Sequence, residues 1–221
     1  MEATRKRKWR WPAWCTALVE HPPLLYRILF PGALWSLPKE KEKVVYLTFD
    51  DGPIPEVTPW VLSVLREKGV KATFFCVGDN VRKHPEVFEQ VKAEGHAIGN
   101  HTFNHLQGWK VSLGSFMANV QKADEWLEHT DLFRPPHGHL RWSQFFRLRK
   151  KYKMVMWDVV TRDYSKHQTP EGTLDSVCKY VKNGSIIVFH DSIKSEANLR
   201  YALPKAIDYL LSEGYRFSLF Q

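Results

Sequence analysis

The sequence of 221 residues has little cysteine and no long hydrophobic run. Its three cysteines, Cys15, Cys76 and Cys178, are far apart and form no CxxC pair, which argues against a thiolate zinc site. No stretch reaches the ~18 consecutive apolar residues that a membrane-spanning helix requires. Proline and tryptophan interrupt the basic N-terminus, so no cleavable signal peptide is recognisable. We therefore expect neither a membrane-spanning helix nor a cysteine-based metal site.

Acidic residues are fewer than basic ones, at 24 against 32, and the net charge is +8. The first ten residues contribute five basic side chains and one glutamate, a net +4. A basic balance favours anionic partners, but no nucleic-acid-binding motif accompanies it, and we predict no nucleic acid partner. Residues 1–42 contain five prolines and four tryptophans. They form either a tail followed by a strap across the domain, which the prolines favour, or a segment whose residues 1–20 contact an acidic membrane surface.

From residue 44 onward, predicted strands and helices alternate. Strands are expected at 44–49, 71–77, 97–99, 132–133, 153–159, 185–189 and 216–220. Helices are expected at 58–68, 85–94, 115–128, from about 143, at 170–182 and at 199–213. This alternation predicts an α/β protein with a parallel sheet covered by helices, either an open doubly wound sheet or a barrel. No glycine-rich dinucleotide fingerprint follows the first strand.

The polar residues of interest share one place in this pattern. Each cluster lies at the carboxyl end of a predicted strand or soon after it: Asp50 and Asp51, His101 and His105, Arg134, Asp158 with Asp163, and His190 with Asp191. The carboxyl ends of parallel strands lie on one face of such a fold, where ligand and catalytic sites are built. The sequence therefore predicts one site that all these strands share.

Two imidazoles and a carboxylate in this set favour a metal. The adjacent carboxylates of Asp50 and Asp51 repel one another unless a positive charge lies beside them, although such a pair alone is also typical of a turn. His101 and His105 are four residues apart and share one face of a helical turn. With Asp51 they supply two nitrogens and one oxygen and leave open positions. No glutamate follows His101, so this is not the HExxH protease motif.

His190 and Arg134 have two interpretations each. His190, after an apolar strand, is either a core histidine or a functional imidazole that Asp158 on the next strand orients and keeps charged. Arg134 forms either a surface ion pair or a bridge to Asp50, and its place among carboxylates favours the bridge.

With these residues in these positions, the chain resembles the polysaccharide deacetylases of carbohydrate esterase family 4, the NodB-homology domain. The family's five motifs occur in order: TFDDGP at 48–53, HTFNH at 101–105, RPPHG at 134–138, WDVVTRDY at 157–164 and VFHDS at 188–192. They define a domain at 43–221, after the N-terminal segment and strap at 1–42. The resemblance implies a distorted (β/α) barrel of seven or eight parallel strands.

The resemblance also implies residue roles. Asp50 corresponds to the general base, Arg134 to its partner, Asp51, His101 and His105 to the ligands of one divalent metal, His190 to the general acid and Asp158 to the carboxylate that orients it. Zinc is the expected metal, with cobalt or another divalent ion as alternatives.

Three substrate-binding positions depart from the family pattern. His137 stands where Tyr or Phe is usual, Tyr164 replaces the commoner Trp, and Val188 replaces the commoner Leu. The resemblance implies that Tyr164 and Val188 line the pocket of the acetyl methyl group and that the backbone N–H of His137 serves the oxyanion. None of these changes removes a catalytic group.

The implied activity is removal of N-acetyl groups from a polymer or oligomer that contains N-acetylglucosamine, such as peptidoglycan or chitin. An O-deacetylase acting on a polymer such as xylan, an enzyme that cleaves small amides, and a non-catalytic glycan-binding envelope protein remain alternatives. The implied location is the cytoplasm or the periphery of the cell envelope. Oligomeric state is not indicated.

Overall fold

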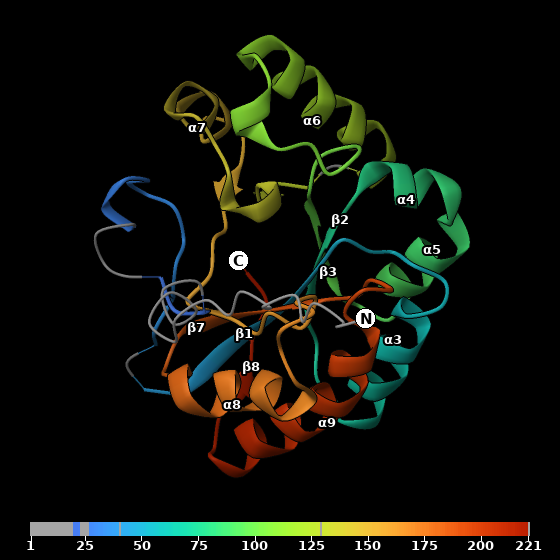
Figure 1. The fold of residues 1–221 in the computed structure, drawn as a ribbon, viewed down its shortest axis with the longest axis vertical. Coiled ribbons are helices and arrows are strands. Elements are labelled where there is room, and N and C mark those ends of the chain that lie inside the picture. Colours follow the sequence, from blue (N-terminus) through green and yellow to red (C-terminus); the bar gives the residue numbers. More distant parts are fainter. Residues whose placement is uncertain (1–19, 23–26, 40, 129, 221) are drawn as a thin grey trace, which may run out of the picture.

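The computed structural model of the protein describes residues 20–22, 27–39, 41–128 and 130–220. Its strands form one parallel sheet with the order β5-β4-β3-β2-β1-β7-β6, and β8 pairs with the start of β1 (Figure 1). The strands are β1 (Val44–Asp50), β2 (Thr73–Cys76), β3 (Ala97–Asn100), β4 (Leu132–Phe133), β5 (Lys153–Met154), β6 (Val159–Val160), β7 (Ser185–His190) and β8 (Arg216–Phe217). The sheet curls into a distorted (β/α) barrel, as predicted.

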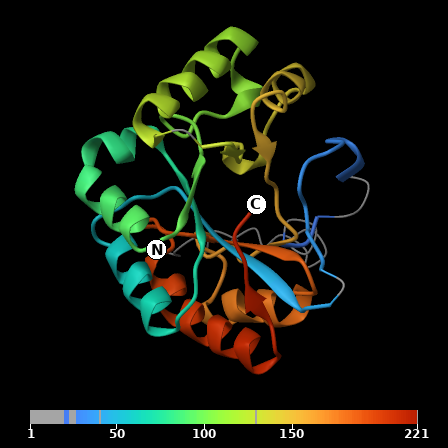
Figure 2. The ribbon, with the colours of Figure 1, turned by 180° about the vertical axis from the view of Figure 1, so that it is seen from behind.

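Helices surround the outside of this curled sheet (Figure 2). They are α3 (Thr58–Glu67), α4 (Gly78–Lys83), α5 (Pro85–Ala93), α6 (Leu113–Leu127), α7 (Trp142–Leu148), α8 (Pro170–Tyr180) and α9 (Glu196–Ser212), with short 3-10 turns η1 (Gly108–Lys110) and η2 (Pro136–Gly138). All predicted helices are present within a few residues. Helix α4 was not predicted, because a single buried valine in six residues gives no periodic signal.

Strand β1 lies at the centre of the sheet and is buried over its whole length. Its side chains alternate between two faces, because successive residues of a strand point in opposite directions. Val45 and Leu47 pack in the cluster beneath the helices, whereas Val44 and Tyr46 pack inside the barrel. The same alternation directs Asp50 to the interior, at the end of the strand where the site lies.

The prediction of one continuous strand at 153–159 is wrong. The structure divides it into β5, which pairs with β4, and β6, which pairs with β7 at the other edge of the sheet. The carbonyl groups of Val155 and Met156, in the interruption, accept hydrogen bonds from Arg134. Because these carbonyls face the barrel interior, they are not available to a neighbouring strand.

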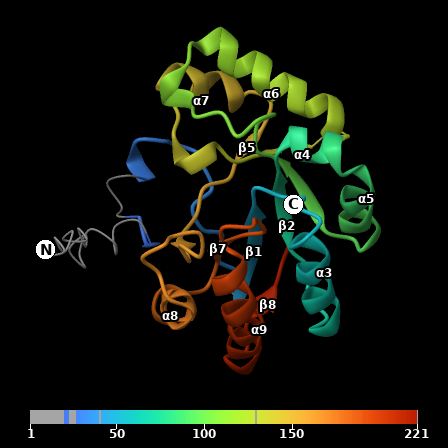
Figure 3. The same ribbon diagram turned by 45° about the vertical axis from the view of Figure 1, so that its right-hand side comes forward.

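Residues 27–39, here called the strap, cross the gap between α7 and α8 (Figure 3). Leu34 forms a parallel bridge with Val155, and Ser36 forms an antiparallel bridge with Ser185. Phe30 of the strap is buried against Phe145 of α7, at 5.2 Å between ring centroids. The strap thus links the residue after β5, at one edge of the sheet, to the first residue of β7, the strand next to the other edge.

The division at residue 42 stays a prediction. Residues 1–19, which include nearly all of the predicted membrane-contacting segment, lie outside the described part. Within that part, no helix combines the length and the hydrophobicity needed to cross a bilayer.

Candidate active site

A pocket of about 720 Å³ opens at the carboxyl ends of the strands. Its lining includes eight of the ten predicted site residues: Asp50, Asp51, His101, His105, His137, Tyr164, Val188 and His190. The other lining residues are Pro22, Pro135, His139, Trp157, Val160 and Lys194. Of the two predicted residues not in this lining, Arg134 is in contact with Asp50, and Asp158 lies elsewhere.

The turn after β1 sets the direction of Asp51. Asp51 has a φ of 85°, and the N–H of Gly52 donates to Oδ1 of buried Asp191 at 3.1 Å. The other carboxylate oxygen of Asp191 accepts from Thr58 at the start of α3. A Cβ on residue 52 would lie 2.0 Å from this carboxylate, so glycine is required. Asp191 therefore holds the turn that carries Asp50 and Asp51.

Three ligating atoms converge beside this turn. Oδ1 of Asp51 lies 3.2 Å from Nε2 of His105 and 3.8 Å from Nε2 of His101. One ligating atom from each of these residues lies within 4.8 Å of the other two. The residues 101–105 form no helix; the positive φ angles of Thr102 and His105, 68° and 57°, bring the two rings together instead.

The donor chemistry of this cluster fits a divalent metal ion. Nδ1 of His101 lies 2.8 Å from the Arg134 carbonyl, which can only accept, so Nδ1 carries the proton and Nε2 keeps its lone pair. Burial lowers the pKa of His101 to about 4, which keeps this ring neutral. Oδ1 of Asp51 is buried without a hydrogen-bond partner among the described residues. A cation would satisfy this oxygen and Nε2 of His101, and a ligating nitrogen of His105 lies within reach of the same point.

Asp50 is held by a fully buried arginine. Nη1 of Arg134 donates to Oδ1 of Asp50 at 2.6 Å and to Thr48 at 2.8 Å, and the guanidinium lies 4.1 Å from the centre of the Phe75 ring. Thr48 and Asp50 point the same way because they are two residues apart on β1. The ion pair fixes the Asp50 carboxylate next to the cluster, where its Oδ2 is 4.0 Å from Nε2 of His101.

His190, at the end of β7, is paired with Asp163. Its Nδ1 lies 2.7 Å from Oδ1 of Asp163, and its backbone N–H donates to Oδ2 of the same carboxylate. Burial alone would lower the pKa of His190, but the carboxylate of Asp163, together with those of Asp51 and Asp50, outweighs burial and raises it to about 9. His190 is therefore charged at neutral pH and has Nε2–H free for the pocket that it lines.

The prediction that Asp158 orients His190 is wrong. The buried carboxylate of Asp158 pairs with Arg27 of the strap and accepts from the hydroxyl of Ser185. The interruption between β5 and β6 explains the difference, because it directs Asp158 toward the strap and leaves the later Asp163 beside His190. Both aspartates occur in the motif WDVVTRDY, but only the strand geometry distinguishes them.

The remaining predicted residues form the walls of the pocket. The His137 ring contacts that of His105 edge-on at 4.8 Å, and the Tyr164 ring contacts that of His190 at 4.7 Å. His137 has a φ of 57°, and its backbone N–H makes no hydrogen bond to any residue that the structure describes. Val188 lies with Trp157 and Val160 in the apolar part of the lining, and the last two were not predicted.

A barrel whose strand ends combine an Asp–His–His cluster with an ion-paired aspartate and a charged histidine has the parts of a metal-assisted hydrolase. Comparison with known proteins agrees. The family model for polysaccharide deacetylase matches residues 38–156, more than half of the chain. The protein belongs to the polysaccharide deacetylase family, and it is a carbohydrate deacetylase.

Named relatives cover most of the chain. A peptidoglycan-N-acetylglucosamine deacetylase of Bacillus cereus is 36% identical over 83% of this chain and 88% of its own length. A chitooligosaccharide deacetylase of Azorhizobium caulinodans is 35% identical over 69% of this chain and 75% of its own. The crystal structure of the Bc1960 peptidoglycan N-acetylglucosamine deacetylase superposes with a TM-score of 0.81 at 31% identity, covering 89% of this chain and 94% of that one.

Proposed function

We propose that the protein removes N-acetyl groups from polymers or oligomers that contain N-acetylglucosamine, with one divalent metal ion. One observation carries the proposal: the Asp50–Arg134 and His190–Asp163 pairs both adjoin the Asp51–His101–His105 cluster at one pocket. The names of the relatives, which act on peptidoglycan and chitooligosaccharide, support the choice of an aminosugar substrate.

Asp51, His101 and His105 would hold the metal, which we propose to be zinc. A divalent ion held by these residues would supply Lewis acidity to the acyl group and to water. The three residues contribute one negative charge, from the carboxylate, and two neutral nitrogens. Open positions remain for water and for the acyl oxygen.

Asp50 accepts the proton of the attacking water. Arg134 holds its carboxylate in place, and the oxygen not bound by Arg134 is left for the pocket that Asp50 lines. His190 delivers a proton to the leaving nitrogen, which is a poor leaving group without it. Its raised pKa keeps that proton available at neutral pH, and general acid catalysis typically contributes about 10²–10⁴ in rate.

His137, Tyr164 and Val188 position the acetyl group. The backbone N–H of His137 donates to the developing oxyanion, a contact whose loss typically costs roughly 10²–10³ in rate. Val188 and the ring of Tyr164 enclose the methyl group beside Trp157. We assign Asp158 no contact with the substrate, since its carboxylate pairs with Arg27.

Acetate release distinguishes this reaction from the alternatives. We expect release from N-acetylglucosamine oligomers or peptidoglycan to exceed release from acetylated xylan and from small N-acetyl amides, and the His190→Ala variant to lose most turnover while it retains metal. The alkoxide of an ester leaves more easily than the nitrogen of an amide and depends less on a general acid, so preferential release from acetylated xylan with little effect of His190→Ala would identify an O-deacetylase. Glycan binding without release from any substrate would identify a binding protein and refute the proposal.

A further inference from the structure

Helix α7 carries an apolar face that nothing in the described structure covers. Phe145 and Leu148 of this helix are buried, whereas Trp142 and Phe146, one turn apart, are 60% and 47% exposed. Two apolar residues of the strap, Ile28 and Leu29, are 64% and 43% exposed. Four of the large apolar side chains that the protein exposes thus occur on two short segments.

These two segments lie side by side in all the ribbon views (Figures 1–3). The guanidinium of Arg149 connects them. It lies 5.8 Å from the centre of the Phe146 ring and against Gly32 of the strap, where a Cβ would be 3.3 Å from its Nη2. We call Ile28, Leu29, Trp142 and Phe146, with the basic residues Arg147, Arg149 and Lys150, the α7 patch.

The two stretches of sequence that carry these apolar side chains contain charge of one sign only. The sequence has no Asp or Glu between residues 21 and 39, or between 132 and 157. Arg147, Arg149 and Lys150 are exposed and form no ion pair with any described residue, whereas the nearby Lys151 and Lys153 pair with aspartates. These three basic side chains, the basic rim of the α7 patch, therefore have no ion-pair partner among the described residues, and Asp124, which lines the same cavity as Arg147 and Lys150, pairs with Lys151 instead.

This charge limits what can cover the patch. The first ten residues of the chain carry a net charge of +4, and a second copy would present the same basic rim. Both are repelled by the patch at close range. An anionic polymer would match the rim but would leave the tryptophan, phenylalanine, isoleucine and leucine in water. A surface that is both anionic and apolar satisfies both halves of the patch.

We infer that the α7 patch docks on the surface of an anionic lipid bilayer. Aromatic and aliphatic side chains enter the boundary between headgroups and acyl chains, and arginine and lysine contact the anionic headgroups. The patch belongs to the folded domain, so this contact is separate from any made by residues 1–20. It begins at Trp142, three residues after His139 of the pocket lining, so docking would hold the pocket near the membrane surface.

Sedimentation of the full-length protein with vesicles tests this inference. Phosphatidylcholine vesicles with and without phosphatidylglycerol serve as probes, and the fraction bound gives a partition coefficient. We expect binding only to the anionic vesicles, and weaker binding as salt is raised. Each basic residue near such a surface contributes about a fivefold factor, so replacing Arg147, Arg149 and Lys150 by glutamine lowers the coefficient by about 100-fold. The double variant Trp142→Ser/Phe146→Ser lowers it by roughly tenfold or more.

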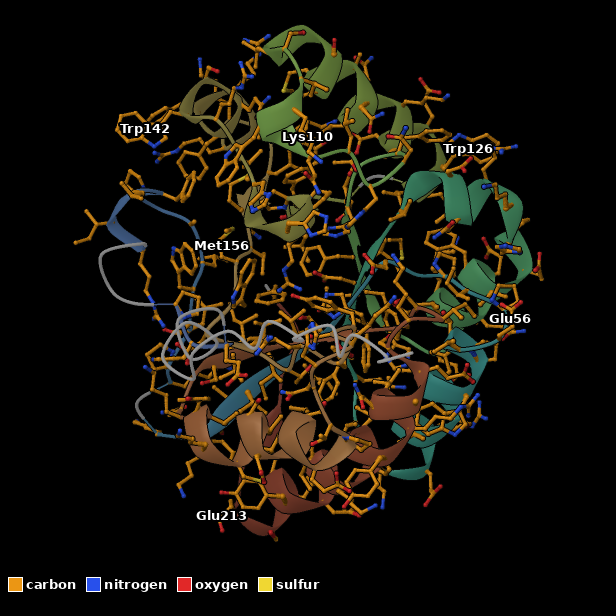
Figure 4. The ribbon with its side chains drawn as sticks, viewed as in Figure 1. Glu56, Lys110, Trp126, Trp142, Met156 and Glu213 are labelled. Atoms are coloured by element: carbon orange, nitrogen blue, oxygen red, sulfur yellow. The ribbon has the colours of Figure 1, made fainter. Side chains whose placement is uncertain are left out.

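Matched controls separate the patch from general surface effects. Trp126 of α6 is 40% exposed and lies far from Trp142 on the molecule (Figure 4), so Trp126→Ser should bind as the wild type does. Glutamine at Lys122, Lys179 and Lys205 removes the same charge elsewhere. Circular dichroism and turnover of a soluble oligosaccharide verify that each variant is folded.

Three results of the vesicle experiment would contradict docking through the α7 patch. Equal binding by the patch variants and their matched controls would show that another part of the chain, such as residues 1–19, carries the contact. Equal binding to neutral vesicles would contradict the anionic requirement, and no binding to either vesicle would refute membrane docking altogether.

Discussion

Replacing Asp163 by asparagine should change how activity depends on pH. The carboxylate of Asp163 faces Nδ1 of His190 at 2.7 Å and is the main reason that the pKa of His190 rises from 6.5 to about 9. That difference corresponds to about 3 kcal/mol in favour of the charged imidazole. Without the carboxylate, burial dominates, and the pKa of His190 should fall to 6.5 or below.

The expected loss follows from the fraction of protonated His190. A pKa that falls from about 9 to 6.5 lowers this fraction only to about three quarters at about pH 6 but lowers it by roughly thirtyfold at about pH 8. The ratio of wild-type to variant kcat/KM should therefore grow by about twentyfold over this range. A metal ion held by Asp51 would lower the pKa of His190 in the wild type and in Asp163→Asn alike. The quantity to compare is therefore the difference between the pH profiles of the two proteins.

The assay is acetate release from an N-acetylglucosamine oligomer, measured as kcat/KM across pH. Asp158→Asn is the matched control, because it makes the same change on the carboxylate that pairs with Arg27 and not with His190. We expect Asp158→Asn to lower stability and to leave the alkaline limb of the profile in place. An unchanged alkaline limb in Asp163→Asn, or a shifted one in Asp158→Asn, would refute the assignment.

Three further predictions concern the residues around the pocket. Arg134→Met leaves the buried carboxylate of Asp50 unpaired and should reduce the free energy of unfolding by about 3–5 kcal/mol, measured by urea denaturation. A change below about 1 kcal/mol would show that the pair is not buried as described. Asp191→Ala leaves the Gly52 N–H without its acceptor and should cost about 1–3 kcal/mol by the same measurement, and an unchanged midpoint would contradict its role in the turn. His105→Ala removes one of three ligands and should abolish stoichiometric zinc after dialysis, measured by atomic absorption, whereas retained zinc would place the ion elsewhere.

The sequence predicted those parts of the fold that depend on continuous local patterns. Strands β1 and β7 are long apolar runs, and their positions differ from the prediction by one residue. The barrel followed from the resemblance to a family, because the alternation of strands and helices alone left an open sheet as an alternative. The meeting of Asp51, His101 and His105 was predictable because all three follow strands of one parallel sheet.

Other features depend on contacts between distant residues. At the interruption of the strand at 153–159, Arg134, some twenty residues earlier, donates to the carbonyls of Val155 and Met156, and the strap residue Leu34 pairs with the backbone of Met154 and Met156. The choice between Asp158 and Asp163 as the partner of His190 follows from that interruption, which no local pattern contains. The close approach of His101 and His105 likewise depends on two positive φ angles, not on the helical turn that their spacing suggests.

The most direct test of the proposed function joins metal content to activity in one preparation. Acetate release from N-acetylglucosamine oligomers is measured on the purified protein, after removal of metal by a chelator, and after addition of zinc, for the wild type and for Asp51→Ala. We predict one zinc per wild-type chain, loss of release with the chelator and its return with zinc, and neither zinc nor release in Asp51→Ala. Undiminished release from metal-free wild type, or full activity of Asp51→Ala, would contradict a metal-dependent deacetylase at this site.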